Sequence, residues 1–381
     1  MEYNENQKMA IDTARAFVEK KIAPVAGLID ENEEFPLENI KEMGRMGLLG
    51  IAYPEKYGGA GLDYMTYSTI IEEIAEVCAS SAMTIVAHST LTADPIFSYG
   101  TEGQRATYLR PLLSGEKMGA FGLTEPNAGS DTAALESKAV ERNDHFVLNG
   151  SKIFITNANV ADIFIIAAKT APEKGMMGIS MFILEKGMPG FGTSGKKEKK
   201  LGMRGSDTGE LFFQDVMVPK ENLLGRKNFG FSMLHHTLVS ARIGMAAIAL
   251  GISEGAKKLC LKYVKQRKQF GKHLYHFQSI KNMLADMEMN TSAGRLLLHN
   301  AASLKDEGKD FTKEASEAKL FASEASMRIT KDAVQIFGGY GYTREFPLER
   351  FFRDAKITEI GDGTSEMQRM IIADEIVKRT K

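Results

Sequence analysis

The spacing of apolar residues changes twice along the chain. Up to about residue 117, apolar residues recur every three or four positions, as in Ile11, Ala14, Phe17 and Val18, which is typical of one face of a helix. From residue 119 to about 225 the period shortens to two, which indicates strands. From residue 228 onward the helical period returns in long runs. The pattern predicts helices, then a sheet, then helices.

This order predicts an α+β protein that is mostly α. The 381 residues are expected to divide, because a single core stops growing near ~250–300 residues. We predict an N-terminal α-helical domain over 1–118, a central, mostly antiparallel β-domain over 119–225, and a C-terminal four-helix bundle over 226–381. Long helices with short connections favour the bundle; they are Leu238–Leu250, Ile280–Leu304 and Phe311–Phe337.

Three local signals add detail to this plan. Asn149-Gly150 lies between HFVL and SKIFIT and predicts a hairpin with a two-residue type I′ turn. Ser365 and Gln368 have the spacing of a capping box ahead of a final apolar helix. Lys305, Asp306, Glu307 and Lys309 are expected on charged faces near helix ends.

Composition excludes several classes of function. With 48 basic and 49 acidic residues the net charge is −1, so no general field attracts nucleic acid or an anionic membrane. Cys78 and Cys260 lie far apart without a C-x-x-C motif, which favours two core thiols in a reducing compartment. We expect a cytoplasmic protein with no signal peptide and no membrane span. No metal site is expected, because the histidines lack partner ligands; they include His88, His235, His236, His273 and His276.

Three segments carry candidate chemistry. The stretch Phe121–Thr132, FGLTEPNAGSDT, combines hydroxyls, glycines and a proline, as in irregular loops that expose N–H groups to an anion or heterocycle. Phe154–Thr156 supplies a ring and a hydroxyl, although Phe154 also suits a core strand. Arg267, Phe270 and Gln278, with the glycines of QIFGGYGY, form a set suited to a pyrophosphate.

A single carboxylate, Asp362, precedes the last helix with Gly363 beside it. A carboxylate at the start of a helix is able to point into a cleft while the free N–H groups of the first turn bind an oxygen. The same residues also suit a plain Asp-Gly turn. Only the rest of the chain distinguishes the two interpretations.

The order and spacing of these segments resemble those of the acyl-CoA dehydrogenase flavoprotein family. The segments are FGLTEPNAGSDT, KIFITN, RKQFG with Gln278, and QIFGGYGYTREFPLERFFRDAKITEIGDGTSEMQR; GLLGIAYPEKYGGAGLD and KLGMRGSDT also match. The resemblance covers practically the whole chain and looks closest to short-chain and butyryl-CoA dehydrogenases. It implies a cytoplasmic homotetramer in fatty acid or alicyclic acid degradation, with one FAD per subunit and an electron-transferring flavoprotein as electron acceptor.

The resemblance also implies roles for individual residues. Phe154, Ile155 and Thr156 would cover the flavin face opposite the substrate, with Phe154 where the family commonly has Trp. Other residues would hold the flavin and phosphates: Phe121, Leu123, Thr124, Gly129 and Ser130. A further set would hold the adenosine diphosphate half of FAD across a subunit boundary: Arg267, Phe270, Gln278, Gln335, Phe337, Gly338 and Gly339. Thr364, Ser365 and Glu366 would close over the cofactor, and Ser130, Arg242 and Gly363 would contact the acyl-CoA.

The implied reaction removes a proton from Cα of an acyl-CoA and a hydride from Cβ, leaving a 2-enoyl-CoA. Most relatives have Glu at the position of Asp362, and a subset place Glu at the position of Ala241 instead. Asp362 is therefore the expected base, one methylene shorter than usual. We hypothesise that the freed volume admits an α-branched or alicyclic acyl group, such as cyclohexane-1-carboxyl-CoA, or a short chain. Asp94 would join the cavity if it does not simply cap a turn before Pro95.

Other functions are compatible with the same resemblance. Nitroalkane oxidases share this fold and use an Asp base, so a flavin oxidase is the first alternative. An acyl-CoA oxidase is less favoured, because those chains usually carry an additional C-terminal helical domain. A non-catalytic acyl-CoA-binding scaffold is a third possibility. Colour from bound flavin and release of peroxide distinguish these classes.

Overall fold

The N-terminal third of the protein is helical, as the apolar spacing predicts. A computed structural model describes residues 3–380. Asp63 caps α4 by accepting a hydrogen bond from the Thr66 N–H at 2.8 Å, and Asp306, far along the chain, accepts one from the Tyr64 N–H at 2.8 Å. The helices of this part are α1 (Glu5–Phe17), α2 (Ala26–Glu31), α3 (Leu37–Arg45), α4 (Tyr64–Ala75), α5 (Ala79–Val86), α6 (Asp94–Tyr99), α7 (Glu102–Gln104) and α8 (Arg110–Leu113).

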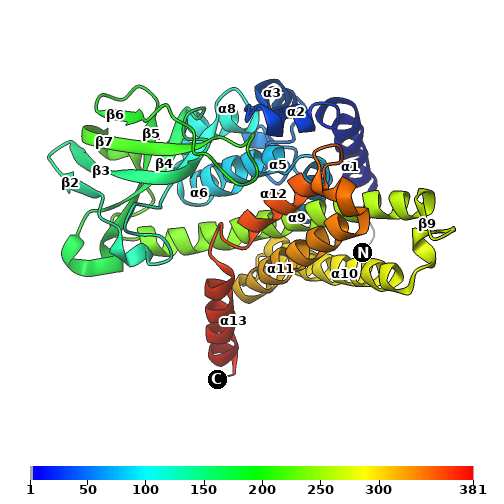
Figure 1. Ribbon diagram of the computed structural model, residues 1–381. Helices are drawn as coiled ribbons and strands as arrows, with labels where there is room; N and C mark the ends of the chain where they lie inside the picture. The colour runs from blue at the N-terminus through cyan, green and yellow to red at the C-terminus, as the bar shows by residue number, and fades with distance from the viewer. Residues whose placement is uncertain (1–2, 381) are drawn as a thin grey trace.

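The middle of the chain forms an eight-stranded sheet at one end of the molecule (Figure 1). The strands follow the order β6-β7-β3-β2-β4-β5-β8, and β1 pairs with β4. Most pairs are antiparallel; β1 and β2 run parallel to β4. The strands are β1 (Gly119–Gly122), β2 (Lys138–Glu141), β3 (His145–Thr156), β4 (Ile163–Lys169), β5 (Ile179–Glu185), β6 (Phe191–Thr193), β7 (Thr208–Pro219) and β8 (Leu223–Leu224).

The predicted hairpin at Asn149-Gly150 is wrong. The strand β3 continues through both residues, and its register against β7 shifts between Leu148 and Gly150. The Asn149 amide donates to Asp215 at 3.0 Å, and the Asp215 N–H donates back to Asn149 at 2.9 Å. Gly150 adopts a φ of 141° against Ser137. The Asn-Gly pair therefore marks a β-bulge, because pairing with β7 outweighs the local turn preference.

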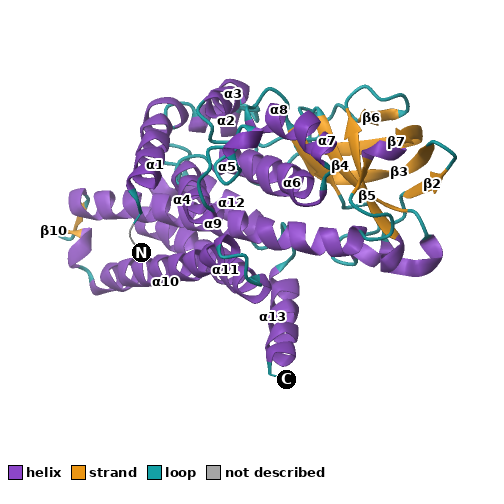
Figure 2. Ribbon diagram, turned by 180° about the vertical axis from the view of Figure 1, so that it is seen from behind, coloured by secondary structure: helices purple, strands orange, loops and turns teal. Residues whose placement is uncertain are grey.

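Long helices make up the C-terminal part, and all three predicted ones are confirmed, the first two with extended ends. A small two-stranded sheet of β9 (Lys268–Gln269) and β10 (Lys272–His273) separates the first two of these helices. In Figure 2 the purple helices α9, α10 and α11 lie side by side, whereas α13 projects away from them. The helices are α9 (Gly230–Gln266), α10 (Gln278–Asp306), α11 (Thr312–Phe337), α12 (Leu348–Thr358) and α13 (Ser365–Arg379).

The start of α13 differs from the prediction. Its N-cap is Thr364, whose side chain accepts from the Met367 N–H at 3.3 Å, so Ser365 and Gln368 form no capping box. Gln368 is fully buried and faces the loop that precedes the helix instead. Burial of that loop, rather than local spacing, therefore decides where the helix begins.

The helix α9 extends across most of the molecule in Figure 1. An 18-residue window of it has a mean hydropathy of 1.3 and meets the length and composition of a membrane span, but 89% of that window is buried inside the protein, as in a core helix. One apolar cluster joins α9 to the helices of both the N-terminal and C-terminal parts. A second lies between helices and sheet, and a third fills the sheet's other face. The domain boundaries stay predictions.

Glycines let α9 approach its neighbours at backbone distance. A Cβ on Gly251 would lie 2.3 Å from the Glu72 carbonyl oxygen, and one on Gly255 would lie 2.3 Å from that of Glu76. Both carbonyls belong to the end of α4 or the residue after it. Cys78 and Cys260, predicted as core thiols, are free and buried close to this contact.

We expect Gly251→Ala to destabilise the protein by about 1–3 kcal/mol, because the new methyl group meets backbone that has no room to move. In an open helix the same change is favourable by up to about 1 kcal/mol. Gly27→Ala in α2 is the matched control, since only Arg350 Nη1, at 4.0 Å, lies near its Cβ. Thermal unfolding of both variants checks this; equal midpoints would show that the α4–α9 contact tolerates a side chain.

Candidate active site

Two of the predicted flavin segments lie side by side. The Ile153 N–H of β3 donates to the Thr124 carbonyl at 2.9 Å, and the Lys152 ammonium donates to the Leu123 carbonyl at 3.1 Å. Phe121, also predicted here, lies in β1 and is buried, while Gly129 and Ser130 are exposed further along the loop. The loop after β1 and the end of β3 thus form one continuous edge.

A buried ion pair fixes this edge. Lys152 Nζ lies 2.7 Å from Glu125 Oε1, and both side chains are almost completely buried. Burial lowers the pKa of Lys152 to about 8, while the carboxylate opposes that shift. Glu125 also accepts a hydrogen bond from the Ser137 N–H at 3.0 Å. Through this pair, Lys152 of β3 is connected to Leu123 at the start of the loop and, by way of Glu125, to Ser137 at its end.

Phe154 is presented to the outside rather than packed in the core. It has a φ of 57°, its side chain is 62% exposed, and the register of β3 shifts between Lys152 and Ile155. Ile155 is buried beside it, and Asn157 donates to the Thr84 carbonyl of α5 at 3.2 Å. A bulky residue with positive φ needs a compensating reason. An exposed aromatic ring in this position suits stacking on a planar heterocycle.

A second predicted set surrounds a cavity of about 640 Å³ at the other end of α9. The Arg267 guanidinium lies 5.9 Å from the Tyr340 ring centroid. A Cβ on Gly338 or Gly339 would meet nothing within 4 Å, so a ligand is able to approach their backbone. Phe337 lines the cavity but is itself buried, stacked on Tyr263 at 3.9 Å. These residues fit the pyrophosphate and adenosine of a dinucleotide.

The remaining residues of that set lie on the surface nearby. Phe270 is 92% exposed, with a φ of 48° between β9 and β10. Gln278 begins α10 and Gln335 lies in the last turns of α11, both exposed. The residues of this set outside the cavity are therefore open to solvent in the single chain.

The two predicted halves of the cofactor site are far apart within one chain. The flavin segment is anchored to α5 through Asn157, and α5 packs on α9 at Gly244. From Gly244 to Arg267 the chain advances about 35 Å along α9, at ~1.5 Å per residue. The flavin edge lies near the sheet, whereas β9 is at the opposite end in Figure 1. The two predicted halves therefore lie well apart within the molecule.

Asp362 lies in a constrained loop between α12 and α13. It has a φ of 54°, and Gly363 has a φ of 98°. The Lys319 ammonium on α11 donates to the Gly363 carbonyl at 2.6 Å, and the Gln368 amide donates to the same oxygen at 2.9 Å. Two buried donors thus hold the peptide that follows the predicted base. Thr364 caps α13, Ser365 is buried and Glu366 is exposed.

The charges around Asp362 are unusual for an interior. Burial raises the pKa of Asp362, and the charges of Lys319 and Arg242 oppose that rise. Burial also lowers the pKa of Lys319 to about 8 and that of Arg242 to about 10. Arg242, predicted near CoA, is buried on α9 and donates to Ser316 at 3.1 Å. The neighbouring Tyr67 hydroxyl is buried without a partner among the described residues.

A second buried carboxylate belongs to Asp94, which begins α6 instead of capping a turn. Its Oδ1 accepts a hydrogen bond from Tyr64 at 3.3 Å and lies 3.7 Å from the Lys305 ammonium. Lys305 also lies over the Tyr64 ring at 3.8 Å and contacts Ser240. Lys305 is thus largely enclosed, with its side chain 11% exposed, although it was predicted on a charged face near a helix end. Asp94 Oδ2 has no hydrogen-bond partner among residues 3–380.

Sequence reasoning missed Lys319, Tyr64 and Tyr67. The signal for Lys319 was present: it stands four residues after Ala315, in the apolar stripe of α11. A lysine on the buried face of a helix needs a specific partner, which makes it a candidate for function.

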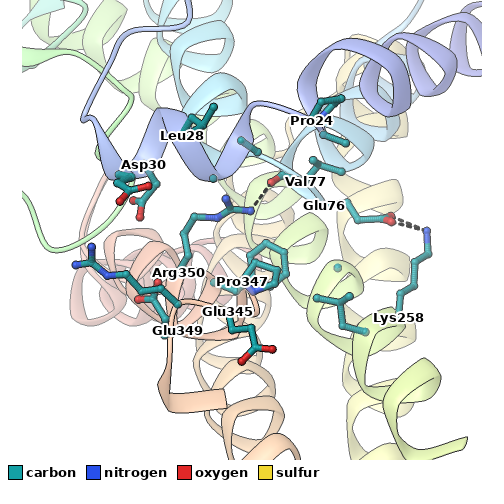
Figure 3. Close-up of a pocket in the computed structure, with 18 residues that line it drawn as sticks. Pro24, Leu28, Asp30, Glu76, Val77, Lys258, Glu345, Pro347, Glu349 and Arg350 are labelled. Carbon is teal, nitrogen blue, oxygen red and sulfur yellow. Dashed lines mark hydrogen bonds and ion pairs between the residues drawn. The ribbon is translucent and has the colours of Figure 1, made fainter. Parts of the chain in front are cut away.

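Another cavity, of about 590 Å³, lies between α2, α9 and α12 and contains none of the predicted site residues. Figure 3 shows Arg350 crossing it to the Val77 carbonyl, at 3.0 Å, and Lys258 paired with Glu76. Its charges are thus largely paired within the protein. This cavity lies where the N-terminal and C-terminal helices meet.

Comparison with known proteins decides the family. Residues 4–116, 120–216 and 228–377 match the N-terminal, middle and C-terminal domains of acyl-CoA dehydrogenase. The chain belongs to the acyl-CoA dehydrogenase family. It is 49% identical to the short-chain-specific acyl-CoA dehydrogenase of Clostridium acetobutylicum over 380 residues, covering 99% of this chain and 100% of that one.

Solved structures agree with this assignment. The butyryl-CoA dehydrogenase of Megasphaera elsdenii has a TM-score of 0.97 and 48% identity, covering 99% of this chain and 100% of that one. A chain in a structure described as the electron transferring flavoprotein of Acidaminococcus fermentans has a TM-score of 0.97 and 47% identity, with the same coverage. The predicted acyl-CoA dehydrogenase fold is confirmed.

This acyl-CoA dehydrogenase is an FAD-dependent oxidoreductase that acts on acyl-CoA. The residues present fit FAD on three observations made above: the exposed Phe154 ring, the open backbone at Gly338 and Gly339, and Arg267 beside them. FAD, when bound, accepts the electrons released by the acyl group. The protein's own residues must then bind the thioester and remove the proton.

Proposed function

We propose that the protein dehydrogenates an acyl-CoA at Cα and Cβ with Asp362 as the base. The observation that carries this proposal is the placement of Asp362: a carboxylate at positive φ, in a loop held by Lys319 and Gln368 and faced by Arg242. A base in this position has a fixed orientation before substrate binds. No other carboxylate is available at the alternative family position, because Ala241 occupies it.

The chemistry follows from the surroundings of Asp362. The carboxylate takes the Cα proton and is more basic than an exposed aspartate, because burial raises its pKa. The thioester oxygen gains negative charge as the proton leaves. We expect the N–H groups that begin α13, at Gly363 and after it, to donate hydrogen bonds to that oxygen. Ser130 and Arg242 are proposed to contact the CoA portion.

We propose a branched, alicyclic or short acyl group as the substrate. Asp362 is one methylene shorter than the usual glutamate, which leaves room at Cα. The buried Asp94, Tyr64 and Lys305 support a shaped, partly polar acyl cavity, since Asp94 Oδ2 still lacks a partner. An acyl ring that fills this space would exclude water from the unpaired oxygen without requiring a long channel.

We further propose a cytoplasmic homotetramer that passes electrons to an electron-transferring flavoprotein. The separation of the flavin edge from the Arg267 cavity supports subunit sharing of FAD, and so do the exposed apolar side chains Phe270, Met370 and Val377. Two free, buried cysteines suit a reducing compartment. The solved relative described with an electron transferring flavoprotein supports the choice of acceptor.

We expect Asp362→Asn to lower kcat/KM for acyl-CoA by about 10²–10⁴-fold while FAD content is unchanged. Activity with an artificial acceptor and with an electron-transferring flavoprotein is the measurement. In the wild type, kcat/KM should rise with pH through the raised pKa of Asp362, because the ionised form is the base. Peroxide release from nitroethane, without turnover of acyl-CoA, would instead identify a nitroalkane oxidase.

The substrate proposal predicts a preference that depends on side-chain length. Wild type should favour cyclic and α-branched thioesters over linear ones, and Asp362→Glu should shift that preference toward linear chains. Asp94→Asn should lower kcat/KM for ring substrates more than for butyryl-CoA. Steady-state kinetics on a matched thioester panel checks both. An unchanged preference in Asp362→Glu would refute the proposed link between the short base and substrate shape.

Subunit sharing predicts that assembly and cofactor retention change together. Arg267→Ala removes the guanidinium beside the Gly338–Gly339 backbone, so we expect weaker FAD retention and loss of tetramers on dilution. Analytical ultracentrifugation with flavin absorbance measures both. Arg328→Ala, on the exposed side of α11, is the control. A monomer with full FAD content would contradict the proposal.

A further inference from the structure

Lys319 is a buried cation with no carboxylate near enough to neutralise it directly. It is fully buried on α11, and among residues 3–380 no carboxylate oxygen lies within 4.0 Å of its Nζ. Its one hydrogen bond in that part of the chain goes to the Gly363 carbonyl. Enclosing an ammonium group in this way is costly unless it serves a neighbouring charge. Among the acidic groups, Asp362 interacts most strongly with the Lys319 charge.

The Asp362 loop receives two different kinds of support. Gln368 donates to the Gly363 carbonyl without carrying charge, whereas Lys319 donates to the same oxygen and carries charge. A Cβ on Gly363 would lie 2.6 Å from Gln368 Nε2, so the loop already fits tightly against this amide. Two hydrogen bonds therefore hold the loop, and one of their two donors also carries a charge.

We infer that Lys319 is a positioning residue of the reaction: it anchors the peptide after Asp362, and its charge favours the ionised carboxylate. This inference rests on the proposed role of Asp362 as the base. Three groups interact electrostatically with Asp362: Tyr67 from α4, Arg242 from α9 and Lys319 from α11. The charges of Glu359, just after α12, and Glu366, in α13, also favour the charged form of Lys319.

The charge count around the base supports this role. At neutral pH Lys319 and Arg242 are both cationic, since their pKa values lie near 8 and 10. They oppose one partly buried carboxylate, so this part of the protein carries excess positive charge. That excess also favours the negative charge that develops on a thioester enolate when its proton moves to Asp362. Arg242 is hydrogen-bonded to Ser316, whereas Lys319 contacts the base loop itself.

Three variants separate anchoring from charge. Lys319→Gln keeps an amide donor and removes the charge, Lys319→Met removes both, and Gln368→Leu removes only the neutral hydrogen bond. We expect the midpoint of the acid limb of kcat/KM to rise by about one pH unit in both Lys319 variants. Below that midpoint both variants should be about tenfold less active than wild type. Above pH 8 Lys319→Gln should approach wild type, because Lys319 itself loses its charge there, whereas Lys319→Met should stay less active because it lacks the anchoring donor. Gln368→Leu should lower kcat without moving the midpoint.

A second measurement does not depend on turnover. Carbodiimide couples an amine to a protonated carboxyl group, so the pH dependence of labelling at Asp362, read by mass spectrometry on the holoenzyme, should show the same upward shift in Lys319→Gln. Thermal unfolding and flavin absorbance identify any variant that does not fold; Lys319→Met then replaces Lys319→Gln.

The outcomes are distinct. If Asp362→Asn retains activity, the proposed base is wrong and this inference falls with it. If Asp362→Asn is inactive but neither the acid limb nor the labelling midpoint moves in the Lys319 variants, the proposed function stands and this inference is overturned. An equal midpoint shift in Gln368→Leu would also overturn it, because the effect would then come from loop geometry.

Discussion

The packing of α9 is the constraint on which the rest of the structure depends. Gly230 begins this helix against the backbone of β5, Gly244 meets Val86 of α5, and Gly251 meets the end of α4. One helix therefore sets the spacing between the sheet and both groups of helices. It also limits the position of the loop between α12 and α13, because Met245 Cε would lie 2.7 Å from a Cβ on Gly361. Small residues on α9 are needed wherever other backbones approach it.

Two ion pairs in the interior hold segments in place without adding much stability. The pair Lys152 and Glu125 holds the loop after β1 against β3, and the pair Lys305 and Asp94 lies beside Tyr64 of α4. Buried ion pairs contribute little net stability, because desolvation offsets much of their attraction. They do fix geometry, since breaking one leaves an uncompensated charge. We therefore attribute to both pairs a role in orienting the segments they join, more than a contribution to stability.

The comparison with relatives separates what is general from what is particular. Fold, cofactor and reaction class follow from matches along practically the whole chain. Asp362 is the position at which this chain is expected to differ from most relatives, which by the sequence resemblance have glutamate there. A change of one methylene in a base alters reach by about the distance that matters for catalysis.

The sequence by itself determined the order of helices and strands, the long C-terminal helices and Asp362 as a candidate base, because periodicity and motif spacing are local properties. Tertiary structure decided the rest. Pairing with β7 made Asn149-Gly150 a bulge, and burial made Lys305 and Lys319 interior charges, although both lie in helices that the pattern predicts. Phe154 became exposed because β3 shifts its register there. Contacts between residues far apart in the chain decide such outcomes, and no local pattern records them.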